Sequence, residues 1–140
     1  MRVHNGLAAF IGIVCGVFAN TVLSHVAMTL FPADAALDWG NQDAVRDYIT
    51  SLPIAAFGLV LLAHLSQSFV AAWVSARLQT TPARWTWLLA GGLSFVGGLM
   101  NFWSIPHPTW MYIELPLYFV VAAVGAKLGR TKTRNLPKVE

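Results

Sequence analysis

Residues 7–31, LAAFIGIVCGVFANTVLSHVAMTLF, decide the fold class, because this run of 25 residues contains no Asp, Glu, Lys or Arg. A helix needs about 20 apolar residues to cross the hydrocarbon core of a bilayer. Three further apolar runs follow at 51–78, 85–105 and 109–128. Runs of this length are too long for the strands of a membrane barrel. The sequence therefore predicts an all-α polytopic membrane four-helix bundle with short connections.

The composition supports a surface that faces lipid. Hydrophobic residues make up 56% of the 140 residues and charged residues only 11%, whereas average soluble chains carry about 25% charged residues. The single cysteine, Cys15, excludes an internal disulfide framework, a cysteine-rich zinc site and a two-cysteine redox pair. The net charge of +3 does not indicate a nucleic-acid partner, since the basic residues stand at the ends of apolar runs.

Lysine and arginine indicate how the spans are oriented. Eight of the nine basic residues lie before the first run, around the connection 79–84 or toward and beyond the end of the last run, and only Arg46 lies in the connection 32–50. Cytoplasmic segments carry the excess of basic residues. We therefore expect a multi-pass bacterial inner-membrane protein with both termini in the cytoplasm. Its transmembrane domain extends over 1–128, and a basic cytoplasmic tail follows over 129–140.

The connection 32–50 is the only polar segment of any size between the spans. Residues 41–48 predict a short helix at the outer interface. The four aspartates of this connection lack the spacing of a calcium-binding loop, so we interpret them as a solvated acidic surface.

Two stripes of small residues predict close helix–helix packing. Spacings of three and four residues place side chains on one side of a helix, and small side chains there let a second backbone approach. The first run carries such a stripe at Ala8, Gly12, Gly16, Asn20 and Ser24, and the third run carries one at Gly91, Ser94, Gly97, Gly98 and Asn101. The packing partner is either another helix of the same chain or a second copy.

The polar side chains within the spans fall into two predicted layers. Polar groups in a bilayer are costly, so each needs a structural or functional reason. Counted at about 1.5 Å per residue, the outer layer holds His25, Asn101 and Glu114, with His107 in the connection beside it. The deeper layer holds Asn20 and His64. These six residues form the candidate polar or ligand site.

Glu114 is the only acid within a span, and Pro116 follows two residues later, where it predicts a kink. One interpretation is a carboxylate that binds a proton or a cation, and the other is a structural acid that forms hydrogen bonds near the interface. A carboxylate that faces lipid costs a few kcal/mol. We therefore predict that Glu114 points inward, within reach of at least one of His25, Asn101 or His107.

The sequence assigns no cofactor and no metal. A haem between two histidines needs both at one depth, and His25 and His64 differ by roughly 11 Å in counted depth. A zinc ion held by His25, His107 and Glu114 is conceivable, but no metal-binding motif supports it. A serine hydrolase triad, a thiol redox centre and a phosphate-binding glycine loop have no support either.

Two motifs, Asp47-Tyr48-x-x-Ser51-Leu-Pro53 … Ala63-His64 and Asn101-x-x-x-Ile105-Pro-His-Pro-x-Trp110, carry a resemblance. They are similar to motifs of an uncharacterised family of small four-span bacterial inner-membrane proteins. The resemblance covers most of residues 31–128 and implies the four-helix fold. It implies no activity, cofactor or site residue.

Three functional hypotheses remain. The first is a non-enzymatic interaction or accessory subunit of an oligomer or larger membrane complex, whose partners are lipid and other membrane-protein chains or copies of itself. The second is a small transporter or channel that uses the intramembrane carboxylate of Glu114. The third and weakest is a metal- or lipid-dependent membrane enzyme.

Overall fold

The computed structural model describes residues 2–130, and within that range the chain forms five α-helices, one 3-10 helix and no β-strand, which confirms the all-α prediction. The elements are α1 (Asn5–Leu30), α2 (Gln42–Ser51), α3 (Ile54–Leu78), α4 (Arg84–Ser104), η1 (Thr109–Ile113) and α5 (Glu114–Gly129). Most of the predicted basic tail, 129–140, lies outside the described residues.

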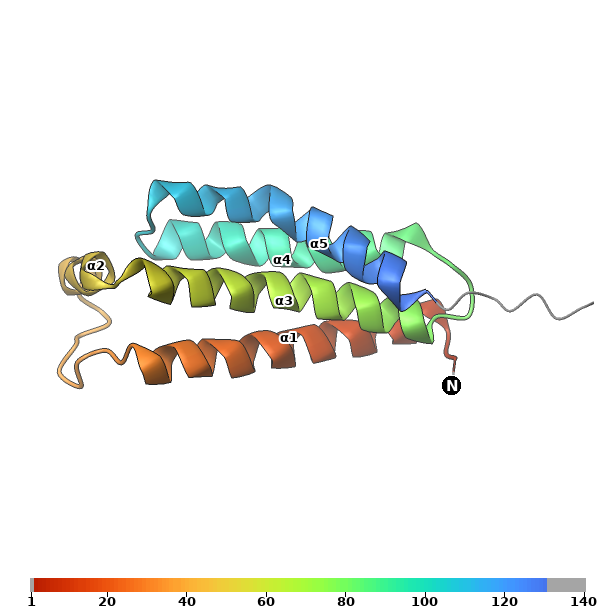
Figure 1. Ribbon diagram of the computed structural model, residues 1–140, viewed down its shortest axis with the longest axis horizontal. Coiled ribbons are helices and arrows are strands. Elements are labelled where there is room, and N and C mark those ends of the chain that lie inside the picture. Colours follow the sequence, from red (N-terminus) through yellow and green to blue (C-terminus); the bar gives the residue numbers. More distant parts are fainter. Residues whose placement is uncertain (1, 131–140) are drawn as a thin grey trace, which may run out of the picture.

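Four long helices lie side by side, and consecutive ones run in opposite directions (Figure 1). Helix α3 occupies the centre: it packs against α1 on one side and against α4 and α5 on the other. The short helix α2 lies at one end, where it joins α1 to α3, and the N-terminus lies at the opposite end (Figure 1).

Three helical segments are long and apolar enough to cross a membrane, namely α1, α3 and the continuous segment Thr109–Gly129. Helix α4 does not belong to this set. Its Ser94, Asn101 and four glycines contribute little hydropathy, so the composition supports three of the four predicted spans. The long helices nevertheless expose large apolar side chains on their outer sides, such as Phe18 of α1, which is 70% exposed.

The helix boundaries follow from local chemistry. The run predicted at 51–78 divides between two helices: Ser51 ends α2, and α3 begins at Ile54 after Pro53. Proline has no N–H to donate and restricts the residue before it to extended conformations, so the chain breaks there and restarts. The predicted helix in the connection 32–50 is present as α2, and the side chain of Asn41 caps it by accepting hydrogen bonds from two backbone N–H groups.

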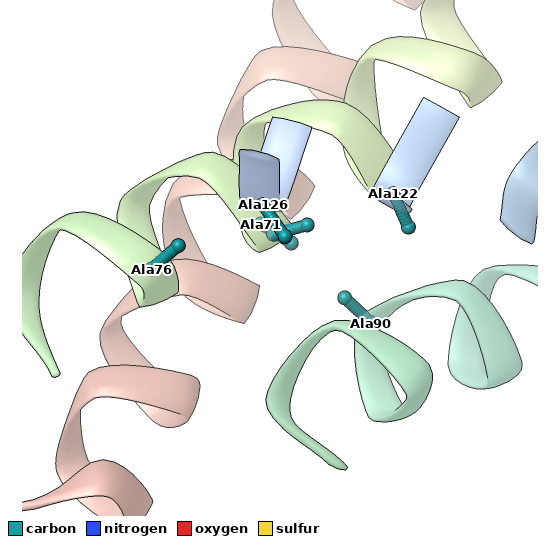
Figure 2. Packing of buried hydrophobic residues seen from close by; sticks show 6 residues of the cluster. Ala71, Ala76, Ala90, Ala122 and Ala126 are labelled. Atoms are coloured by element: carbon teal, nitrogen blue, oxygen red, sulfur yellow. The ribbon is translucent and has the colours of Figure 1, made fainter. Parts of the chain in front are cut away.

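The interior is built from small side chains. A buried cluster of alanines joins the three helices α3, α4 and α5 (Figure 2), and its members are Ala71, Ala72, Ala76, Ala90, Ala122 and Ala126. Alanine brings the helix backbones close together, which increases van der Waals contact where lipid tails supply no hydrophobic driving force.

The small-residue stripe of α1 faces α3 of the same chain. A Cβ atom at Gly12 would collide with Ser75 and with the backbone carbonyl of Ala71. A Cβ atom at Gly16 would lie 2.9 Å from the Cβ of Ala71, and it would also collide with the Gln67 carbonyl. Both positions therefore require glycine for this helix pair.

The stripe of α4 divides between two environments. Gly91 and Gly98 pack against Phe119 and Tyr118 of α5, whereas the space beside Gly97 is open. Helix α5 in turn packs Gly125 against the backbone of α3. This last seam was not among the sequence predictions.

Candidate functional site

Glu114 lies inside the helix packing, where its side chain is only 1% exposed. It is the first residue of α5, directly after the 3-10 helix η1. Pro116 stands in the first turn of α5. The N–H groups of the first turn have no acceptor within an α-helix, so the missing N–H of proline removes no hydrogen bond of α5 there. The proline therefore stands near the start of an α-helix, after a tighter turn, and the kink that the sequence predicts there stays a prediction.

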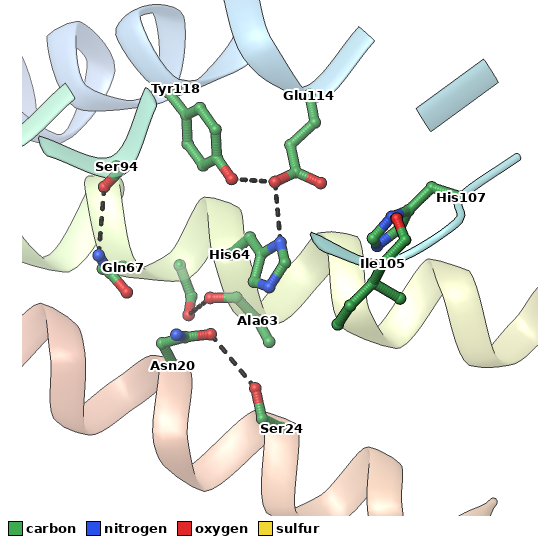
Figure 3. Close-up of polar contacts among 11 residues, drawn as sticks. Asn20, Ser24, Ala63, His64, Gln67, Ser94, Ile105, His107, Glu114 and Tyr118 are labelled. Carbon is green, nitrogen blue, oxygen red and sulfur yellow. Dashed lines mark hydrogen bonds and ion pairs between the residues drawn. The ribbon is translucent and has the colours of Figure 1, made fainter. Parts of the chain in front are cut away.

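The Glu114 carboxylate forms two contacts through one oxygen atom (Figure 3). His64 of α3 donates from Nδ1 to Oε1 at 2.8 Å, and Tyr118 donates its hydroxyl to the same oxygen. The second oxygen, Oε2, is buried and has no hydrogen-bond partner among the described residues. One oxygen thus accepts from two residues while the other remains unsatisfied.

The predicted partners of Glu114 were wrong, although its inward orientation was expected. No hydrogen bond joins Glu114 to His25, Asn101 or His107 among the described residues. His25 is exposed on α1. His107 donates from Nδ1 to the backbone carbonyl of Ile105 at 2.6 Å, and its ring packs edge-on against Phe102.

The error came from the counted depths, which placed His64 below the outer layer. That count assumed that every span starts in one plane and rises as an α-helix. The first five residues of the last span form a 3-10 helix, which rises about 2.0 Å per residue instead of 1.5 Å and carries Glu114 deeper. The end of α3 that joins α2 also extends past the α4–η1 connection (Figure 1). The two predicted layers therefore meet at Glu114 and His64.

A pocket of about 390 Å³ lies next to this pair, between α1, α3 and α4. It contains the other predicted candidates Asn20 and Asn101 together with Ser94 and Gly98, which the sequence assigned to helix packing. The lining residues come from all four long helices: Asn20, His64, Gln67, Ser94, Gly97, Gly98, Met100, Asn101, Ser104 and Tyr118.

Hydrogen bonds within the pocket leave some polar groups available. Ser24 donates to the side-chain oxygen of Asn20 at 3.3 Å, and Gln67 donates to the hydroxyl of Ser94 at 3.5 Å (Figure 3). The amide nitrogen of Asn20 and the amide oxygen of Gln67 have no partner in these bonds. Glu114 does not line the pocket, but its two donors, His64 and Tyr118, do.

Tyr118 is the member of this cluster that sequence reasoning missed. A signal was present, because residues four apart on a helix share a face and Tyr118 is four residues after Glu114. An aromatic residue is common in a span rich in apolar residues, so Tyr118 does not stand out in the sequence. A tyrosine buried to 2% exposure does need a hydrogen-bond partner, and the carboxylate supplies it.

The described residues bring no three His, Cys, Asp or Glu side chains together in a group that could hold a metal ion. His107 lies outside the apolar helices, and its burial lowers the pKa of the imidazole below the ordinary value of 6.5. The Ile105 carbonyl and Glu114 raise this pKa, but burial has the larger effect. The neutral imidazole is therefore the favoured form in the α4–η1 connection.

Comparisons of the chain with protein-family models, with curated proteins and with solved structures give no match. The carboxylate, the histidine and the pocket are therefore the features that bear on function.

Proposed function

We propose that the protein is a four-span bacterial inner-membrane protein with both termini in the cytoplasm, in which α4 is the fourth span. The position of α4 supports this, since it lies beside α5 and α3 over its length (Figure 1). Its outward residues Leu93, Val96 and Leu99 are large, apolar and exposed, as expected for side chains that face lipid. Membership of the uncharacterised four-span family that the motifs resemble is part of the same proposal.

Within this topology we infer that the protein is a small proton-linked transporter. The observation that carries the inference is the buried Glu114 carboxylate, which meets His64 and Tyr118 beside a polar pocket. An ionisable group inside a bilayer is expensive and typically marks a substrate, ion or proton pathway. A purely structural acid would be expected to have both oxygen atoms satisfied, and Oε2 of Glu114 is not.

The geometry supports a specific path for a proton from the pocket to Glu114. The Nδ1–H of His64 points at Glu114, and the ring also lines the pocket. A proton that arrives from the pocket binds the free ring nitrogen Nε2 and gives an imidazolium. The imidazolium then releases the Nδ1 proton to Glu114, and the ring is neutral again with its proton on Nε2. Tyr118 holds the accepting oxygen in place by a second hydrogen bond.

The hypothesis of an accessory subunit loses part of its support from the sequence. It drew on the small-residue stripes, whose packing partner the sequence left open between the same chain and a second copy. Gly12 and Gly16 instead contact α3, and Gly91 and Gly98 contact α5. Packing within one chain thus accounts for these four glycines.

Proton flux into liposomes tests the proposed transport. We expect reconstituted wild-type protein to dissipate an imposed pH gradient, as measured with a trapped pH-sensitive dye. Glu114→Gln keeps the size of the side chain but cannot exchange a proton, so we expect the flux to fall to the level of empty liposomes. Asp47→Asn, in the exposed polar helix α2, is the matched control and should retain the wild-type flux.

A wild-type flux in Glu114→Gln would reject the carboxylate mechanism. His64→Phe separates the two parts of the route: it keeps a ring of similar size but removes both nitrogens. We expect this variant to lose the flux as well. Wild-type flux in His64→Phe would reject the histidine relay and leave Glu114 with a different proton path.

A further inference from the structure

We propose that the pocket between α1, α3 and α4 binds a small neutral molecule that carries both hydrogen-bond donors and acceptors, such as a short polyol or a carboxamide. This inference rests on the proposed transport function, because it names the class of solute that the same site would take.

The pocket is placed to receive a solute from one side of the membrane. Its lining on α4 runs from Ser94 to Ser104, a length of about 15 Å at the rise of an α-helix. Ser94 lies near the middle of α4, and Ser104 is its last residue, at the end of the molecule where α2 lies. Gly97 lines this stretch with open space where a side chain would stand. The pocket therefore extends from mid-helix to the outer end of α4.

The charge of the lining selects against ions. None of the lining residues is Lys, Arg, Asp or Glu, so beside a neutral His64 an anion finds no cationic partner, and a cation finds no carboxylate in the lining. Glu114 is close, but His64 and Tyr118 occupy one of its oxygen atoms, and its side chain is only 1% exposed. Moving an ion into this site carries a desolvation cost that no lining group offsets.

The polar groups of the lining match a neutral solute instead. The amide nitrogen of Asn20 is available as a donor, and the amide oxygen of Gln67 is available as an acceptor. Asn101 adds a side-chain amide that forms no hydrogen bond with the rest of residues 2–130. A volume of about 390 Å³ lies within the range of small-molecule pockets, about 300–1,000 Å³.

His64 links solute binding to the proton. With Nδ1–H donated to Glu114, the neutral ring offers Nε2 as an acceptor, and Figure 3 shows this atom directed toward α1. A protonated ring offers a donor at the same place. Solutes that donate to His64 therefore bind the neutral form better, and by linkage their binding opposes protonation. The titratable groups near the ring are Glu114 and Tyr118 on α5 and His107 in the α4–η1 connection, whereas α1 and α4 contribute only amide and hydroxyl groups to the polar lining.

Nitrogen NMR of histidine-labelled protein in lipid nanodiscs tests the inference. Erythritol and propionamide are the neutral probes, and tetramethylammonium and acetate are the charged probes. We expect the neutral probes to shift the Nε2 signal of His64 in a saturable manner and to leave the signal of exposed His25 unchanged. The signals are assigned by their loss in His64→Phe and His25→Gln.

Asn101→Leu removes one amide from the lining without adding a charge. We expect it to weaken binding of the neutral probes roughly two- to tenfold, the effect of one hydrogen bond. Thr29→Val is the matched control, because Thr29 is exposed on α1 and bonds only to its own helix. This control should bind the probes as the wild type does.

Two results would overturn the inference: the absence of a saturable shift with both neutral probes, or an equal shift with a charged probe. Failure of the proposed transport gives a different pattern. If Glu114→Gln keeps the proton flux but the wild type still binds erythritol, the transport mechanism is wrong and the solute class stands. If the flux depends on Glu114 but no neutral probe binds, the solute class is wrong and the proton mechanism stands.

Discussion

The Nδ1 atom of His64 lies 2.8 Å from Oε1 of Glu114, although 50 residues separate the two in the sequence. This contact joins the centre of α3 to the first residue of α5. It brings a titratable base and a titratable acid together inside the helix packing. The proposed proton chemistry depends on this one contact.

Removal of one partner of the pair should destabilise the protein more than removal of both. Glu114→Leu leaves His64 and Tyr118 without their acceptor, so we expect the free energy of unfolding to fall by about 3–5 kcal/mol. The double variant Glu114→Leu, His64→Leu should recover part of this loss, since buried pairs replaced by apolar side chains are often close to neutral. Equilibrium unfolding in lipid bicelles measures these two variants and the single variant His64→Leu. A double variant whose loss equals the sum of the single losses would show that the two residues do not interact.

The seam between α1 and α3 predicts a large difference between two glycines. Gly16→Ala places a methyl group against Ala71 and the Gln67 carbonyl, and we expect a loss of about 1–3 kcal/mol from overpacking. Gly92→Ala enters open space on α4 and should be neutral or slightly stabilising, because alanine favours helix by up to about 1 kcal/mol. Thermal unfolding in the same detergent compares the two. Equal effects would mean that α1 does not pack on α3 through Gly16.

The sequence locates the long helices well, because an uninterrupted run without charge has few other interpretations. Its main boundary error, at 51–53, arises where Pro53 separates two helices that a hydropathy pattern cannot distinguish. The hydropathy of α4 does not by itself show whether this helix spans the membrane. Ser94, Asn101 and the glycines that line the pocket are the residues that make α4 less apolar.

The candidate site could be predicted only in part. The cost of a carboxylate in lipid correctly indicated that Glu114 faces inward. Its partner depended on the relative height of two helices, which the 3-10 segment η1 and the extension of α3 changed. The rise along a helix can be counted from the sequence only when it is known whether the helix is an α-helix or a 3-10 helix. His64, Asn20 and Asn101 were therefore identified as candidates, but their arrangement around one pocket was not.

The His107 imidazole predicts a pH dependence of stability. Burial lowers the pKa of His107 in the folded chain below 6.5. At a pH between this lowered pKa and 6.5, the unfolded chain therefore binds the proton more readily than the folded chain. The contribution of His107 to stability is therefore present above about pH 6.5 and lost as the pH falls below it. We expect His107→Asn, which keeps a donor for the Ile105 carbonyl, to flatten this part of the stability profile. A histidine titration by NMR that gives His107 a pKa above 6.5 would contradict this.

The four-span topology predicts which positions a membrane-impermeant thiol reagent labels from outside intact cells. In a Cys15→Ser background, Asp38→Cys in the connection 32–50 should be labelled, because we place that connection on the outer side. Thr81→Cys in the α3–α4 connection should be labelled only after the cells are opened. Labelling of both positions from outside would place the connections before and after α3 on one side of the membrane and reject the orientation.

Infrared difference spectroscopy of the reconstituted protein tests the central claim, that Glu114 exchanges a proton inside the helix packing. The C=O stretch of a protonated carboxyl group is separated from that of a carboxylate, so a change of pH reveals each titrating acid. We predict a carboxyl band that changes with pH, is absent from Glu114→Gln, shifts in His64→Phe and is unchanged in Asp47→Asn. A pH-difference spectrum of Glu114→Gln that is identical to that of the wild type would contradict the claim, because Glu114 would then hold one protonation state throughout.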